Sequence, residues 1–181
     1  MDRVTKKPKL ATAWLGGCSG CHMSFLDLDE RLIDLAGLVD FCYSPVMDAK
    51  EFPEGVDITL VEGAVANEDH VREIRLIRQR SRILVAFGDC AVTGNVTAMR
   101  NLFSVEDVLE RAYRESSVVT GVPTGSDLVP RLLDRVVRVQ DVVGVDYFLP
   151  GCPPSAAAIY DFVSDLLAGR TPVSEDRKFG S

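Results

Sequence analysis

The sequence of 181 residues, 46% of them hydrophobic, suits one well-packed domain, and its net charge of -7 argues against a nucleic-acid-binding protein. No apolar run reaches the roughly 20 residues that cross a bilayer, and residues 11–15, which follow the basic N-terminus, are too short for the core of a signal peptide. We therefore expect a cytoplasmic protein without membrane insertion, in which the cysteines stay reduced.

Apolar runs alternate with amphipathic ones, which is typical of a parallel sheet covered by helices. The expected strands are residues 10–15, 39–43, 57–62, 83–87 and 143–149. The expected helices are residues 24–36, a segment capped by Asn67, residues 104–114 capped by Ser104, and residues 155–167. The pattern predicts a single flavodoxin-like domain, a doubly wound α/β fold over residues 1–170, followed by a polar tail, 171–181.

Some details of these elements are also predicted. The helix over residues 24–36 should be continuous and end at Gly37. The helix over 104–114 should turn an apolar stripe inward, formed by Val105, Val108, Leu109 and Ala112. Trp14 should pack in the core, as aromatic residues of buried strands mostly do. Residues 129–139 fit a helix or a strand equally well.

Four cysteines follow the predicted strands. Cys18 and Cys21 come after the first strand, Cys90 after the fourth and Cys152 after the fifth. Ligands of open parallel sheets bind outside the carboxyl ends of the strands, so these loops share one edge of the sheet. We expect the four thiols to converge there on a metal centre. Cys42 lies inside a strand and is expected to be an ordinary core residue.

The backbone around these cysteines is permissive, which favours a ligand-binding role. Gly17, Gly88 and Gly151 precede the cysteines, and Pro153 follows Cys152 directly. Glycine allows sharp turns and close approach of amide groups to an anionic cluster, and proline after the last cysteine recurs in ferredoxin motifs.

Several kinds of site remain open at this stage. Structural zinc usually takes two paired knuckles, whereas here one C-x-x-C is followed by two distant cysteines, which favours an iron-sulfur cluster. A thiol-disulfide oxidoreductase using Cys18 and Cys21 would leave Cys90 and Cys152 unexplained. A flavodoxin-like carrier of FMN is a further alternative, because the expected fold is a flavin scaffold.

The chain resembles the small subunits of nickel-iron hydrogenases, most closely the short NAD-reducing type. The matching segments are WLGGCSGCHMSFLD at 14–27, VEG at 61–63, GDCA at 88–91 with GN at 94–95, and PGCPP at 150–154. The related complex I subunit is similar over these loops, but it has adjacent cysteines at the first position, whereas Ser19 and Gly20 separate Cys18 from Cys21. A small subunit of another hydrogenase, or a complex I-like cluster subunit, remains an alternative.

The resemblance implies a role, a cofactor and partners. It assigns Cys18, Cys21, Cys90 and Cys152 to one 4Fe-4S cluster that relays electrons. The nickel-iron centre would belong to a large subunit, and further iron-sulfur and FMN-binding subunits would reduce NAD. The longer family members carry two more clusters, but no cysteine or histidine follows Cys152, so we expect one cluster.

Other residues are expected to lie beside the cluster. Glu62 ends the third strand at the same edge, and a solvated carboxylate is the alternative interpretation. Asp89 would accept amide hydrogen bonds that fix the Cys90 loop, or be a solvated turn residue. His22 would donate a hydrogen bond to a sulfur, or serve the loop or a subunit interface. Gly17, Gly151 and Pro153 complete the expected surroundings.

Overall fold

A five-stranded parallel sheet forms the centre of the protein. The computed structural model describes residues 6–115, 121–122 and 129–172. The strands are β1 (Lys9–Trp14), β2 (Asp40–Tyr43), β3 (Val56–Glu62), β5 (Ser81–Phe87) and β7 (Tyr147–Leu149). Their order across the sheet is β2-β1-β3-β5-β7, and all neighbours are parallel. These are the five expected strands in the flavodoxin-like order, so the predicted fold class is confirmed.

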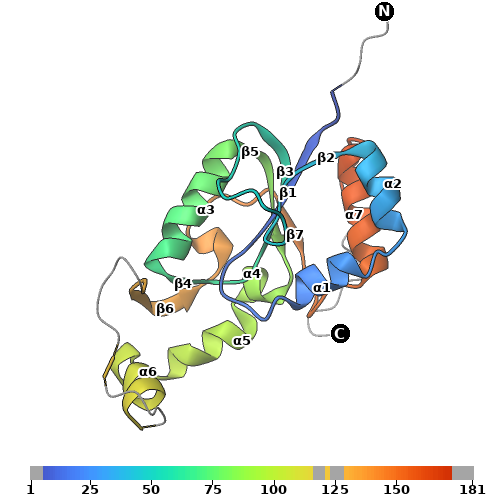
Figure 1. Ribbon diagram of the computed structural model, residues 1–181. Coiled ribbons are helices and arrows are strands. Elements are labelled where there is room, and N and C mark those ends of the chain that lie inside the picture. Colours follow the sequence, from blue (N-terminus) through green and yellow to red (C-terminus); the bar gives the residue numbers. More distant parts are fainter. Residues whose placement is uncertain (1–5, 116–120, 123–128, 173–181) are drawn as a thin grey trace, which may run out of the picture.

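Helices cover both faces of the sheet (Figure 1). One face carries α1 (Gly20–Leu26), α2 (Arg31–Leu38) and α7 (Ala156–Leu167), and the other carries α3 (Glu68–Arg80) and α4 (Asp89–Thr93). The predicted cap of α3 is confirmed, because the Asn67 side chain accepts a hydrogen bond from the His70 amide. Ser155 caps α7 in the same way, by accepting from the Ala158 amide. Within the described residues, no helix has the length and apolar character of a membrane span.

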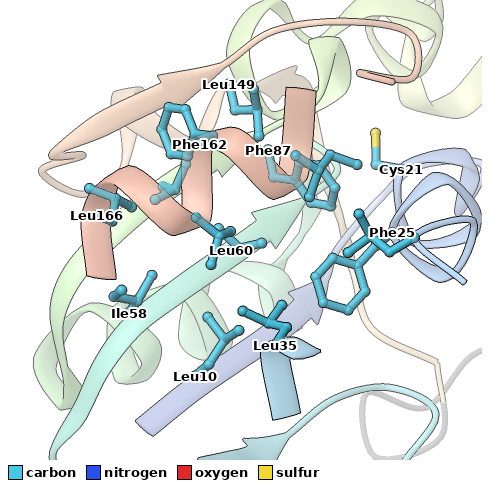
Figure 2. Packing of buried hydrophobic residues seen from close by; sticks show 14 of the residues in the cluster. Leu10, Cys21, Phe25, Leu35, Ile58, Leu60, Phe87, Leu149, Phe162 and Leu166 are labelled. Atoms are coloured by element: carbon cyan, nitrogen blue, oxygen red, sulfur yellow. The ribbon is translucent and has the colours of Figure 1, made fainter. Parts of the chain in front are cut away.

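The larger core cluster lies between the sheet and α1, α2 and α7. Leu60, Phe87 and Phe162 are buried at its centre, as Figure 2 shows. Burying side chains of this size stabilises the fold by about 1.5–3 kcal/mol each. Cys21 lies at one end of the cluster, close to Phe25 and Phe87, so the packed core reaches the edge that carries the cysteine loops.

The continuous helix expected over residues 24–36 is wrong. The segment forms α1 and α2, with a turn between them in which Asp29 has a φ of 51°. The leucines whose spacing suggested one helix are nevertheless buried: Leu28 lies in the turn and Leu35 in α2. Gly37 lies inside α2 rather than ending it.

A small second sheet accounts for part of the segment that was hard to interpret. β4 (Val65–Asn67) pairs antiparallel with β6 (Leu132–Val137), so residues 132–137 are strand, and the short η3 (Val139–Asp141) follows. The expected last strand begins later, at Tyr147. The pairing of β7 with β5 does not extend back beyond Tyr147. At Asp146 the side-chain carboxylate accepts a hydrogen bond from the Leu84 amide, while the Asp146 amide donates one to the Leu84 carbonyl.

The segment after α4 leaves the body of the fold. It comprises α5 (Asn95–Ala98), η1 (Met99–Leu102), α6 (Val105–Glu110) and η2 (Arg111–Glu115), which Figure 1 shows extending from α4. Ser104 caps α6 as predicted. The predicted apolar stripe of Val105, Val108, Leu109 and Ala112 lines one pocket together with Leu132 of β6. In the described residues of α6 and η2, no side chain is fully buried, because these turns lie beside β6 and not on the main sheet. Residues 173–181 of the expected tail lie outside the described residues.

Candidate metal centre

The loop that carries Cys18 is fixed to the end of β3. The Leu15 amide donates to the Glu62 carbonyl at 2.8 Å, and Gly16 and Ala64 exchange two backbone hydrogen bonds of 2.9 and 2.7 Å. This approach requires glycine at Gly63, which has a φ of 90° and whose added Cβ would lie 2.9 Å from the Gly16 oxygen. Gly17 is adjacent to the same strand end, so the predicted glycine turn is in place.

The loops that carry Cys90 and Cys152 are tied to each other. The Gly88 amide donates to the Leu149 carbonyl at 2.8 Å, and the Asp89 amide donates to the Gly151 carbonyl at 2.9 Å. The Asp89 carboxylate accepts from the Gly151 amide at 2.7 Å, and this side chain is only 5% exposed. Asp89 therefore fixes the loop, as one of the two interpretations predicted, and is not a solvated turn residue.

Helix α1 completes the enclosure of the same edge. The Ser24 hydroxyl donates to the Pro154 carbonyl at 2.6 Å, which ties the turn after Cys21 to the loop of Cys152. Asn95 Nδ2 donates to the Cys152 sulfur at 3.3 Å. The Cys152–Pro153 peptide bond is cis. Hydrogen bonds thus link the loops of all four cysteines.

The four sulfurs act on one another electrostatically. Burial raises the pKa of the Cys21 thiol, and negative charge on Glu62 and on Cys90, Cys18 and Cys152 raises it further. Burial also raises the pKa of Cys90, while a hydrogen bond with Thr97 lowers it and charge on Cys18 and Cys152 raises it. Thiolates gathered in this way need a compensating positive centre, which metal ligation supplies.

Glu62 and His22 form a buried pair beside this cluster of cysteines. Glu62 is 2% exposed and accepts from the His22 amide at 2.9 Å and from His22 Nδ1. The solvated-carboxylate interpretation of Glu62 is therefore wrong. His22 is 4% exposed, and the expected hydrogen bond from its ring to a sulfur is absent among the described residues, because Nδ1 is bound to Glu62 and Nε2 has no partner there.

Cys42 stands apart from the other cysteines. Its sulfur lies 3.5 Å from the Leu10 carbonyl within the sheet, and the charges that act on it are Lys9, Asp40 and Asp57.

Within the described ranges, no three His, Cys, Asp or Glu side chains gather closely enough for a single metal ion. A cube of four irons is wider than one ion, and the donor set of four free thiols on linked loops fits such a group.

The sequence interpretation missed two contributions to the site. The hydrogen bond from Ser24 to Pro154 joins residues 130 positions apart, so no local sequence pattern predicts it. Asn95 was noted only as part of a matching segment, but its side chain hydrogen-bonds the Cys152 sulfur. The one available signal was its place in the Gly94-Asn95 pair.

Known proteins are similar to this chain in sequence and in fold. The family described as NADH ubiquinone oxidoreductase, 20 Kd subunit, matches residues 18–166. The chain belongs to this family. Among curated members, the delta subunit of the NAD-reducing hydrogenase HoxS of Cupriavidus necator is 42% identical over 170 residues, which cover 91% of this chain and 80% of that subunit.

Further relatives include one longer protein and one solved structure of similar length. A subunit of the F420-non-reducing hydrogenase vhu of Methanocaldococcus jannaschii is 38% identical over 93% of the chain, which spans 59% of that relative. A chain in the crystal structure of NAD+-reducing NiFe hydrogenase in the H2-reduced state superposes with a TM-score of 0.89 at 44% identity, over 94% of this chain and 97% of that one. The resemblance to nickel-iron hydrogenase small subunits is confirmed.

A more distant structure shares the fold alone. The Ni-Fe-Se hydrogenase of Desulfomicrobium baculatum matches with a TM-score of 0.57 at 20% identity, over 94% of this chain and 68% of that one. The doubly wound domain is therefore kept where most of the sequence has changed.

Proposed function

We propose that this chain is the electron-transfer subunit of a cytoplasmic NAD-reducing nickel-iron hydrogenase, and that Cys18, Cys21, Cys90 and Cys152 hold one 4Fe-4S cluster. The observation that carries the proposal is the gathering of four free thiols on hydrogen-bonded loops at one sheet edge. The hydrogenase names of the relatives supply the activity, H2 + NAD+ = H+ + NADH. Electron transfer through a cluster needs no general acid, general base or nucleophile from this chain.

The residues of this chain would hold and shield the group. The four thiols bind as thiolates, and a 4Fe-4S cluster supplies one-electron transfer when bound. Asn95 directs an amide N–H at the Cys152 sulfur, which favours the more reduced, more negative state. The Asp89 bond and the core beneath Cys21 hold the ligands in place and keep water from the inner side.

The partners follow from the same proposal. Cys18 and Cys152 are exposed in the isolated chain, so the outer side of the site must be covered by another subunit. That subunit would be the large subunit with the nickel-iron centre, and iron-sulfur and FMN-binding subunits would pass electrons on to NAD. A small subunit of another hydrogenase is the second candidate, favoured by the 38% identity to the relative from Methanocaldococcus jannaschii.

Iron analysis tests the proposal. Anaerobically purified protein should be brown and contain about four irons per chain. Serine in place of any of the four cysteines should lower the iron content, whereas Cys42→Ser should keep it, since Cys42 lies within the sheet. Colourless protein with one zinc, or iron that is insensitive to Cys90→Ser and Cys152→Ser, would contradict the proposal.

An insulin-reduction assay and an absorption spectrum test the alternatives from another class. A thiol-disulfide oxidoreductase would reduce insulin through Cys18 and Cys21, and this activity would survive Cys90→Ser and Cys152→Ser. A flavodoxin-like carrier would show the absorption bands of FMN in place of those of a cluster.

A further inference from the structure

The segment from α5 to η1 carries a row of exposed apolar side chains. Val96, Met99, Leu102 and Phe103 form this apolar row, and all four are between 61% and 80% exposed. Residues three apart lie on the same side of a helical segment, so the first three members of the row point in one direction. Surface helices normally turn their apolar side toward the core. The apolar row is turned toward solvent, which is the arrangement of a surface that another protein covers.

The opposite side of the same segment is polar and is fastened to the body of the fold. The Thr97 hydroxyl donates to the Gly16 carbonyl at 3.0 Å. Asn101 Nδ2 donates to the Val136 carbonyl at 2.8 Å, and Asn101 Oδ1 accepts from the Val136 amide at 2.7 Å. Arg100 Nη2 donates to a backbone carbonyl of β6 at 2.9 Å. These hydrogen bonds hold the polar side inward, so the apolar row cannot turn toward the core without breaking them.

The apolar row begins at the cysteine edge. Asn95 is the first residue of α5 and donates to the sulfur of the exposed Cys152, and the row starts with the next residue. The bond from Thr97 to Gly16 ties the same short helix to the loop of Cys18, the other exposed cysteine. Figure 1 shows α5 leaving the body of the fold at this edge, next to α4. A subunit that covers the two exposed cysteines therefore lies directly beside the apolar row.

We propose that the large subunit of the hydrogenase, which carries the nickel-iron centre, docks on the apolar row as well as on the cysteine edge. This inference rests on the proposed function. Interfaces between permanent subunits are more hydrophobic than the rest of a protein surface, and the apolar row has this character. The partner surface that fits it is apolar, because a charge buried against apolar side chains loses its hydration. The row then gives the large subunit a second contact beside the cysteine loops.

The dissociation constant of the purified complex, measured on dilution, tests the inference. Met99→Glu places a charge in the middle of the apolar row and should raise the dissociation constant for the large subunit at least about tenfold. Leu38→Glu is the matched control, because Leu38 is 55% exposed and ends α2 just before β2 starts, at the opposite edge of the sheet. This variant should stay within about twofold of the unchanged chain. Equal weakening by both variants, or none by Met99→Glu, overturns the inference.

A photo-reactive benzoylphenylalanine in place of Met99 identifies the occupant directly and does not depend on the folding of Met99→Glu. Cross-linking within the complex to the subunit that contains nickel supports the inference. Cross-linking to an iron-sulfur or FMN-binding subunit or to a second copy of this chain, or no cross-link at all, overturns it. If the chain holds about four irons but position 99 does not cross-link to the large subunit, only the docking inference fails. A chain without iron contradicts the proposed function itself.

Discussion

Gly88 is the position at which the smallest possible change should disable the site. It has a φ of 82°, and a Cβ added to it would lie 2.1 Å from the Cys21 sulfur. Ordinary contact begins at 3.4 Å, so the sulfur or the backbone must move by about 1.3 Å (3.4 minus 2.1) in Gly88→Ala. With a ψ of 163°, this backbone conformation is essentially confined to glycine, and a side chain there adds about 1–3 kcal/mol of strain. Because Cys21 is also packed at the end of the core, its sulfur has little room to yield.

A matched glycine separates the two effects. Gly55 has a φ of 66°, and nothing lies within 4 Å of its added Cβ, so Gly55→Ala carries the backbone strain alone. Both variants should lower the melting temperature by roughly 2–8 °C from strain. Only Gly88→Ala should also lose most of its iron, measured per chain after anaerobic purification. Full iron content in Gly88→Ala, or equal iron loss in both variants, would refute the steric argument.

Three further predictions concern loop fixation, core packing and pH. Asp89→Ala should cost about 1–3 kcal/mol of unfolding free energy and lower the iron content, because the Gly151 amide loses its acceptor. Asp89→Asn keeps an acceptor oxygen and should lose less stability and less iron. Urea unfolding and iron analysis check both variants. Phe162→Ala, at a side chain 1% exposed, should cost about 3–5 kcal/mol, and Phe148→Ala, at one 41% exposed, less than about 1 kcal/mol; similar values for the two would contradict the packing described. Burial lowers the pKa of His70 below its usual 6.5, so at mildly acidic pH the unfolded chain binds a proton more readily than the folded chain does. The free energy of unfolding should therefore fall as the pH drops through about 6.5. Urea unfolding at about pH 7.5 and 5.5 should show a smaller loss in His70→Gln than in the unchanged chain.

The regular part of the fold was predictable because parallel strands buried on both faces leave continuous apolar runs. β3 shows this, with all but one of its residues buried. The break between α1 and α2 was not predictable, since Leu28, Leu32 and Leu35 keep a helical spacing across a turn that Asp29 makes by a left-handed backbone. β4 is only three residues long and pairs with β6 far along the chain, so no local periodicity identifies it.

The placement of the cysteine loops at one sheet edge was predictable, but the contacts that support these loops were not. Strand order alone brings the loops of Cys18, Cys90 and Cys152 to one edge. The sequence did not decide whether Glu62 was buried or solvated, because burial of a carboxylate depends on a partner, and that partner is the ring and amide of His22. The prediction that Trp14 packs in the core is wrong: its ring is 42% exposed, because Trp14 is the last residue of β1, at the open end of the sheet.

The ties between β5 and β7 also constrain the order of events during biosynthesis. β7 is the edge strand and is translated last of the five, and the loop that it positions carries Cys152. When only the first four strands have left the ribosome, three of the four proposed ligands are present, but the Gly151 amide and carbonyl and the Pro154 carbonyl that hold the Cys152 loop are not. If the four cysteines hold the proposed cluster, its assembly would be complete only after β7 has formed, and a truncated chain would lack the ligand Cys152.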